Sequence, residues 1–165
     1  VLLLATSDPP AVWTLILSAR LSLAPCTVNP VLVAGLPVSL GILSAGTLQG
    51  SGDADPTFHL FALELTHCPP GTNRVTAKFT GTRDSNNLSL FANTATTNPA
   101  SNVAAEVSKQ SNPAELISHN SVMIANVDAT SGTATFPLAA RMKSPKGRAT
   151  GGNVSTTMMV DFTYQ

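Results

Sequence analysis

Apolar and polar residues alternate with a period of two along much of the chain, a pattern typical of β-strands and not of helices. Residues 12–23 form a long example near the start of the sequence. One parity of this stretch carries Trp13, Leu15, Leu17, Ala19, Leu21 and Leu23. The other parity includes Val12 and Ile16, so the second face is not wholly polar. Shorter alternating runs predict strands at residues 59–66, 74–81, 103–107, 122–127 and 133–141.

Residues 154–164 predict another long amphipathic strand near the end of the sequence. One parity carries Val154, Thr156, Met158, Val160, Phe162 and Tyr164. The other parity is more polar and includes Ser155, Thr157, Asp161 and Thr163. Chain ends usually fray, so a pattern that continues to this point indicates a strand that is paired. The apolar stretch at 12–23 would be an aggregation hazard as an exposed edge, and we expect it to pack within this chain or against another.

Turn-forming residues separate these runs. They occur at Pro69-Pro70-Gly71, at residues 84–87, at residues 97–99 and at Ser131-Gly132. Several short strands divided by such turns predict an all-β sandwich. Pro113 argues against regular structure in residues 110–117, which are therefore predicted to form a loop.

The composition narrows the class of protein. The chain has 165 residues, a length that suits one domain with a substantial core. Nine Lys and Arg residues balance nine Asp and Glu residues, so the basic face of a nucleic-acid binder is not expected. The long uncharged stretch at residues 31–49 contains several Gly and Pro breakers. A membrane-spanning helix needs about 20 mostly apolar residues, so no membrane insertion is predicted.

The candidate chemistry is sparse. Cys26 and Cys68 cannot make a structural zinc site alone, since such sites take four Cys or His ligands. A disulfide between them is favoured over a metal site and implies an oxidising compartment. The sequence has no nucleophile elbow, phosphate-binding loop or dinucleotide fingerprint. We therefore predict no catalytic residues, no metal, no cofactor and no enzymatic activity.

Five segments, taken in order, resemble the subunits of chaperone–usher fimbriae. They are Cys26-Thr27-Val28, residues 62–68 (ALELTHC), residues 74–81 (RVTAKFTG), residues 136–141 (FPLAAR) and residues 162–165 (FTYQ). Gly152, the fourteenth residue from the C-terminal end, and the penultimate Tyr164 resemble the chaperone-recognition pattern of that family. The resemblance covers the chain from about residue 11 onward. Within residues 63–81 it is strongest to the minor tip-adaptor pilins of type 1-like fimbriae.

This resemblance implies a specific fold and assembly route. Such pilins have an incomplete immunoglobulin-like β-sandwich that lacks its final strand, which leaves a hydrophobic groove along the last strand. A periplasmic chaperone fills the groove first. The N-terminal extension of the next subunit then replaces it at an outer-membrane usher, by strand addition. The expected location is the cell-surface fimbria, reached through the periplasm, and the expected contribution is to cell adhesion.

The same resemblance assigns residues. It implies an N-terminal extension at residues 1–21, with the donor strand at about 12–21, and a pilin domain at residues 22–165. The donor positions are Trp13, Leu15, Leu17, Ala19 and Leu21, and the family usually has glycine where Ala19 stands. The strand for the chaperone or the incoming donor carries Gly152, Val154, Thr156, Met158, Val160, Phe162 and Tyr164. Cys26 and Cys68 would tether strands within the domain.

Two alternatives from other classes stay open. One is a lectin-like adhesin built on the same sandwich, although two-domain adhesins of this family lack a donor extension. The other is a secreted β-sandwich unrelated to fimbriae, which would be a self-sufficient monomer. Rod subunit and tip adaptor are both compatible with the sequence, as are several acceptor subunits and host receptors. Residues 1–10 fit either a mature extension or a leader remnant.

Overall fold

The computed structural model describes residues 26–29, 35 and 38–165. Over these ranges the protein consists of β-strands with one short 3₁₀ helix, η1 (Ala45–Leu48). The strands are β1 (Thr27–Val28), β2 (His59–Thr66), β3 (Arg74–Gly81), β4 (Phe91–Ala92), β5 (Ala104–Lys109), β6 (Asn112–Ile117), β7 (Val122–Asn126), β8 (Ala134–Lys143) and β9 (Met158–Tyr164). The predicted strand at 12–23, with all the predicted donor residues, lies outside the described residues.

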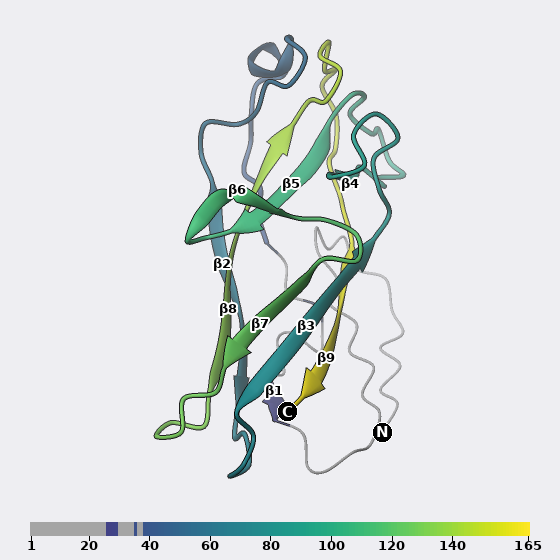
Figure 1. Ribbon diagram of the computed structural model, residues 1–165. Coiled ribbons are helices and arrows are strands. Elements are labelled where there is room, and N and C mark those ends of the chain that lie inside the picture. The colour runs from purple at the N-terminus through teal and green to yellow at the C-terminus, as the bar shows by residue number, and fades with distance from the viewer. Residues whose placement is uncertain (1–25, 30–34, 36–37) are drawn as a thin grey trace.

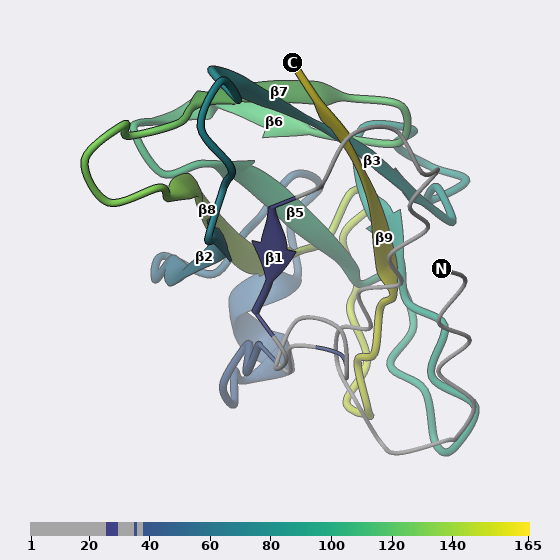
Figure 2. The same cartoon turned by 90° about the horizontal axis from the view of Figure 1, so that it is seen from below.

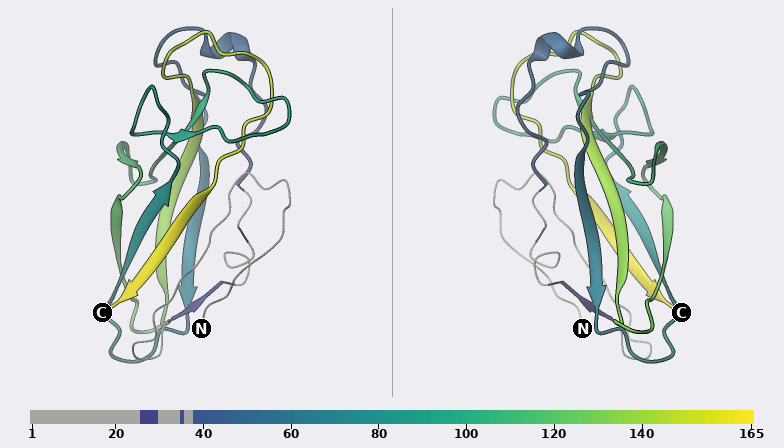
Figure 3. Two further views of the ribbon diagram at one scale, coloured as in Figure 1. Left: turned by 90° about the vertical axis from the view of Figure 1, so that its right-hand side faces the viewer. Right: turned by 90° about the vertical axis from the view of Figure 1, so that its left-hand side faces the viewer.

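The strands form two antiparallel sheets that pack as a sandwich (Figure 1). One sheet has the order β1-β2-β8-β5-β4, and β6 pairs with β5 beside this path. The other sheet has the order β7-β3-β9. Seen from the side, β7, β3 and β9 form one layer, and β2 and β8 lie in the other (Figure 3). The expectation of an all-β, immunoglobulin-like sandwich is confirmed.

The core lies between the sheets and follows from the period-two pattern. On β3, Val75, Ala77 and Phe79 are fully buried, whereas Arg74 before them and Lys78 between Ala77 and Phe79 are exposed. Successive strand residues point to opposite faces, so this alternation places one row of side chains in the core. Phe136 of β8 meets Phe162 of β9 across the core, with ring centroids 5.7 Å apart. The two sheets therefore contact each other through aromatic and branched side chains.

The sequence pattern located most strands well. β2 and β3 have the predicted bounds, and β5, β7 and β8 differ from prediction by one or two residues at their ends. The prediction of a loop at residues 110–117 is wrong, because Asn112–Ile117 form β6. Pro113 is tolerated because β6 is exposed and its pairing register with β5 shifts between Ser108 and Lys109. Proline is compatible with edge strands and bulges, where its missing N–H is not needed.

The predicted strand at 154–164 is shorter in the structure. β9 begins at Met158, which pairs with Gly81, the last residue of β3. Residues 154–157 lie beyond the end of β3 and so cannot continue that ladder. Hydrogen bonds to residues 92–100 replace it for part of this stretch, including Thr94 N to Ser155 O at 2.7 Å. The backbone before β9 is thus held mainly by the loop that follows β4.

A buried carboxylate organises one part of the six-stranded sheet. Glu106 of β5 is only 2% exposed. It accepts hydrogen bonds from Arg141 Nε at 2.6 Å and from Lys143 Nζ at 2.7 Å, both on the neighbouring strand β8. Arg141 also stacks on the Phe58 ring, with its guanidinium carbon 4.3 Å from the ring centroid. One acidic side chain therefore fixes two cations and an aromatic ring.

We expect Glu106→Gln to lower the free energy of unfolding by about 1–3 kcal/mol, because the two cations lose a charged acceptor. Arg141 and Lys143 keep some access to water, so the loss stays below that of a fully buried pair. Chemical denaturation followed by circular dichroism measures the change. Glu115→Gln is the matched control, since Glu115 pairs with Lys109 at the surface and its loss leaves the midpoint almost unchanged. Equal effects of the two substitutions would contradict this account.

Candidate functional site

The last strand, β9, is an edge strand of the three-stranded sheet, with β3 between it and β7 (Figure 2). Just beyond its end, Gln165 and Arg74 exchange both main-chain hydrogen bonds, each at 2.9 Å. Bonded and non-bonded pairs alternate in an antiparallel ladder. Met159, Asp161 and Thr163 therefore bond β3, and the residues between them direct their N–H and C=O groups away from β3.

The same alternation continues before β9. Asn153 donates its N–H to Asn98 O at 2.8 Å, and its carbonyl accepts from Ala100 N at 2.9 Å. Ser155 N donates to the side-chain oxygen of Asn93 at 2.9 Å. Residues 93–100, which we call the bracing segment, thus take over the side that β3 occupies further along. The odd-numbered residues face β3 or the bracing segment, so the even-numbered residues face the opposite side.

We call that opposite side the free edge. Its main-chain groups belong to Val154, Thr156, Met158, Val160, Phe162 and Tyr164. In the ranges 26–29, 35 and 38–165, β9 pairs with β3 alone, and no residue forms a ladder along the free edge. The free edge is therefore a row of donors and acceptors of the kind that pairs with an added strand.

The side chains of the same residues point into the core. Thr156, Met158, Val160 and Phe162 are buried, and Val154 and Tyr164 are partly buried and pack against the core. Burial raises the pKa of the Tyr164 phenol above its usual value. A strand that paired with the free edge would place its own alternate side chains into the same space between the sheets. The site can therefore recognise both main chain and apolar side chains.

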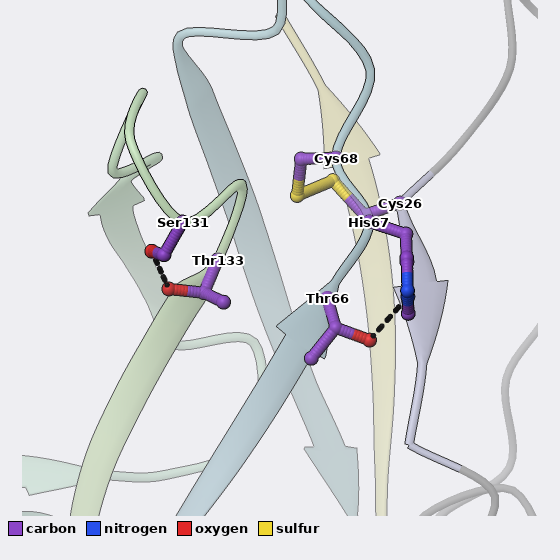
Figure 4. Close-up of a disulfide and its surroundings, with 6 residues drawn as sticks. All are labelled: Cys26, Thr66, His67, Cys68, Ser131 and Thr133. Carbon is purple, nitrogen blue, oxygen red and sulfur yellow. Dashed lines mark hydrogen bonds between the residues drawn. A yellow bond between two sulfur atoms is a disulfide. The ribbon is translucent and has the colours of Figure 1, made fainter.

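A disulfide fixes the edge of the other sheet. Cys26 and Cys68 are bonded, with Cα atoms 4.0 Å apart, which confirms the predicted bridge (Figure 4). It joins the start of β1 to the end of β2, where β1 has only two paired residues. Cys68 N also donates to Gly132 O at 2.9 Å. The bridge spans 42 residues and, in the chain-entropy estimate, contributes about 4 kcal/mol.

Gly152 has a local structural reason to be glycine. Its φ of 149° is one that other residues rarely adopt. A Cβ atom there would lie 2.6 Å from both Ala100 N and Asn98 O. The bracing segment can therefore approach this backbone only because Gly152 has no side chain. Its predicted role in chaperone recognition stays a prediction.

The structure brings together part of the predicted site. Val154, Thr156, Met158, Val160, Phe162 and Tyr164 share one inward face and one free edge, and Gly152 lies just before them. Their role in accepting a strand stays a prediction. Sequence reasoning missed Asn93, which lies among polar turn residues that give no signal of long-range contacts. It also missed Glu106, where a carboxylate inside an apolar strand could have indicated a buried ion cluster.

In the described part of the chain, no group of three or more His, Cys, Asp or Glu residues could hold a metal ion. No helix in these ranges has the length and apolar character needed to cross a membrane.

The fold and the free edge define a class, the immunoglobulin-like sandwiches whose last strand pairs on one side only among the residues that the structure describes. The sequence matches the Fimbrial protein family over residues 15–165. It is 33% identical to the protein FimG of Escherichia coli K12, over 92% of this chain and 84% of that protein. The chain therefore belongs to the Fimbrial protein family. It is a type 1-like fimbrial subunit, located in cell-surface fimbriae.

Solved structures agree on the fold. The P pilus rod subunit PapA superposes with a TM-score of 0.67, over 86% of this chain and all of PapA, at 19% identity. A chain from a chaperone–usher pilus structure gives a TM-score of 0.67 over 98% of this chain and 100% of that chain, at 18% identity. At such low identity these matches establish the fold alone.

Gly152→Ala should destabilise the domain by about 2–4 kcal/mol, because the new methyl group meets the backbone of the bracing segment and adds strain at this φ. Thermal unfolding measures the change. The neighbouring Gly151→Ala is the control, since a Cβ at Gly151 meets nothing within 4 Å. Similar melting temperatures for the two variants would refute this reading of Gly152.

Tyr164 is the only tyrosine in the sequence, so a phenolate absorbance titration reports this residue alone. We expect a pKa above 10.0 in the folded protein, because burial disfavours the charged phenolate. The raised pKa contributes stability below the unfolded pKa, and that stability is lost as the pH rises through the folded pKa. In denaturant the pKa should return to the ordinary tyrosine value. An identical titration in both states would contradict the burial of this ring.

Proposed function

We propose that this fimbrial subunit polymerises by donor-strand exchange, with residues 12–21 of one subunit pairing with the free edge of another. One observation carries the proposal: the residues whose main-chain groups pair with no described strand are the same residues whose side chains face the core, most of them apolar. An added strand would gain hydrogen bonds and apolar burial at once. The role is structural and involves no catalytic step.

The proposed donor and acceptor match in pattern. The free edge offers six alternate residues between Val154 and Tyr164, and the donor offers alternate apolar residues from Trp13 to Leu21. Each net hydrogen bond contributes about 0.5–1.5 kcal/mol. Each buried large apolar side chain contributes about 1.5–3 kcal/mol. Because these contacts must break together, the complex is expected to dissociate very slowly.

The free edge also requires a partner before assembly. An exposed strand edge with apolar neighbours is an aggregation hazard. A periplasmic chaperone that covers the edge, followed by exchange at an outer-membrane usher, removes this hazard at each stage. The domain division at residues 1–21 and 22–165, and a contribution to cell adhesion, belong to the same proposal.

Ala19 is expected to tune the choice of acceptor. The resemblance places glycine at this position in related subunits, where the groove is narrow. The methyl group of Ala19 needs extra room in the acceptor, so we propose that it restricts which subunits this donor enters.

Val160→Pro should weaken strand addition while sparing the fold. Proline removes an N–H that faces the free edge, and the bonds to β3 come from Met159 and Asp161 instead. The measurement is the dissociation rate of a fluorescent synthetic peptide of residues 11–23 from the full-length chain. We expect dissociation at least about tenfold faster than from the wild type, because a hydrogen bond is lost and the ring obstructs the incoming strand.

Val160→Ala is the control, because it removes side-chain volume but keeps the N–H. Circular dichroism checks that both variants fold. If the proline and alanine variants release the peptide at the same rate, pairing through this edge is wrong. A second peptide carrying Ala19→Gly tests the methyl group: tighter binding of that peptide would support the proposed restriction, and equal binding would remove it.

A further inference from the structure

We infer that Asn93 is a positioning residue that determines how much of the free edge an added strand can use. This inference rests on the proposed strand addition. The free edge has two parts with different support. Met158, Val160, Phe162 and Tyr164 lie on β9 and are backed by β3, whereas Val154 and Thr156 lie beyond the last β3 pair, Gly81 with Met158.

The side chain of Asn93 makes four hydrogen bonds to main-chain groups. Its Nδ2 donates to Ala100 O at 3.0 Å and to Asn153 O at 2.9 Å. Its Oδ1 accepts from Ala95 N at 3.1 Å and from Ser155 N at 2.9 Å. The bonds to Ala95 and Ala100 lie within the bracing segment. The bonds to Asn153 and Ser155 attach this segment to the chain around Val154 and Thr156.

Other contacts converge on the same place. Thr94 donates to Ser155 O through both its N–H, at 2.7 Å, and its hydroxyl, at 3.1 Å. The Asn153 side chain donates to Thr97 O at 2.7 Å. Thr156 Oγ1 donates to Ala92 O at 2.8 Å, just before the bracing segment. The bracing segment therefore acts as a substitute strand, and Asn93, its first residue, makes four of the hydrogen bonds that hold it in place.

The chemistry explains why an asparagine is needed. A primary amide offers two donors and an acceptor oxygen with two lone pairs, and all of this capacity is used here. Aspartate can accept but not donate, and alanine can do neither. Without Asn93, the chain at Val154 and Thr156 regains backbone freedom that an incoming strand must remove. The part of the free edge on β9 keeps its hydrogen-bonded ladder with β3 and is unaffected.

Hydrogen–deuterium exchange of individual amides tests this division. The full chain is mixed with excess synthetic peptide of residues 11–23, and protection is compared with and without peptide. In the wild type, the peptide should protect the amides of all six free-edge residues. In Asn93→Ala, protection at Val154 and Thr156 should fall at least about tenfold, while protection on β9 stays unchanged. If residues 11–23 of a neighbouring chain pair with the free edge in place of the peptide, the pattern of protected amides is the same, because the two sequences are identical.

Controls separate the possible failures. Asn112→Ala removes an asparagine with two local hydrogen bonds on β6, and it should leave all six amides protected. The isosteric Asn93→Asp variant loses both donated bonds and gives the same comparison if the alanine variant does not fold. Full protection at Val154 and Thr156 in folded Asn93 variants would overturn the inference. No protection of any free-edge amide in the wild type would instead refute the proposed strand addition.

Discussion

The two-sided hydrogen bonding of β3 is the constraint on which the three-stranded sheet depends. On one side, Phe79 N donates to Ser121 O at 2.9 Å near the start of β7. On the other side, the bonds between Arg74 and Gln165 set the register of β9. Because alternate residues of an antiparallel strand bond to opposite neighbours, this register directs the main-chain groups of the inward-facing residues of β9 away from β3. A shift of one residue would turn the apolar row to the solvent and pair the edge differently.

On β9, the position of a residue in the alternating pattern sets both whether its side chain is buried and whether its main chain bonds β3. The same alternation that fills the core also selects which amides remain available. An apolar residue on β9 therefore contributes to the fold and to the edge at once. Surface positions on this strand, such as Thr163, are free of this double requirement because their main-chain groups are already bonded to β3.

Much of this arrangement could be predicted from the sequence, because it depends on local alternation. The bounds of β2 and β3, the inward parity of residues 154–164 and the disulfide all follow from patterns that are visible in one pass. β1 and β4 have two residues each, too few to show a period. β6 was hidden by Pro113, whose meaning depends on the strand beside it. The bracing segment depends on side-chain bonds between residues about sixty positions apart, which no local pattern encodes.

The bridge between Cys26 and Cys68 has a mechanical consequence. A pulling force applied at Cys26 enters the domain at this bridge. β1 alone would resist by two residue pairs, which can peel apart one after the other. The covalent bond carries the load past β1 to the end of β2, which is paired along its length with β8. A pull on that end loads many hydrogen bonds together, so the domain is built to bear force along its strands.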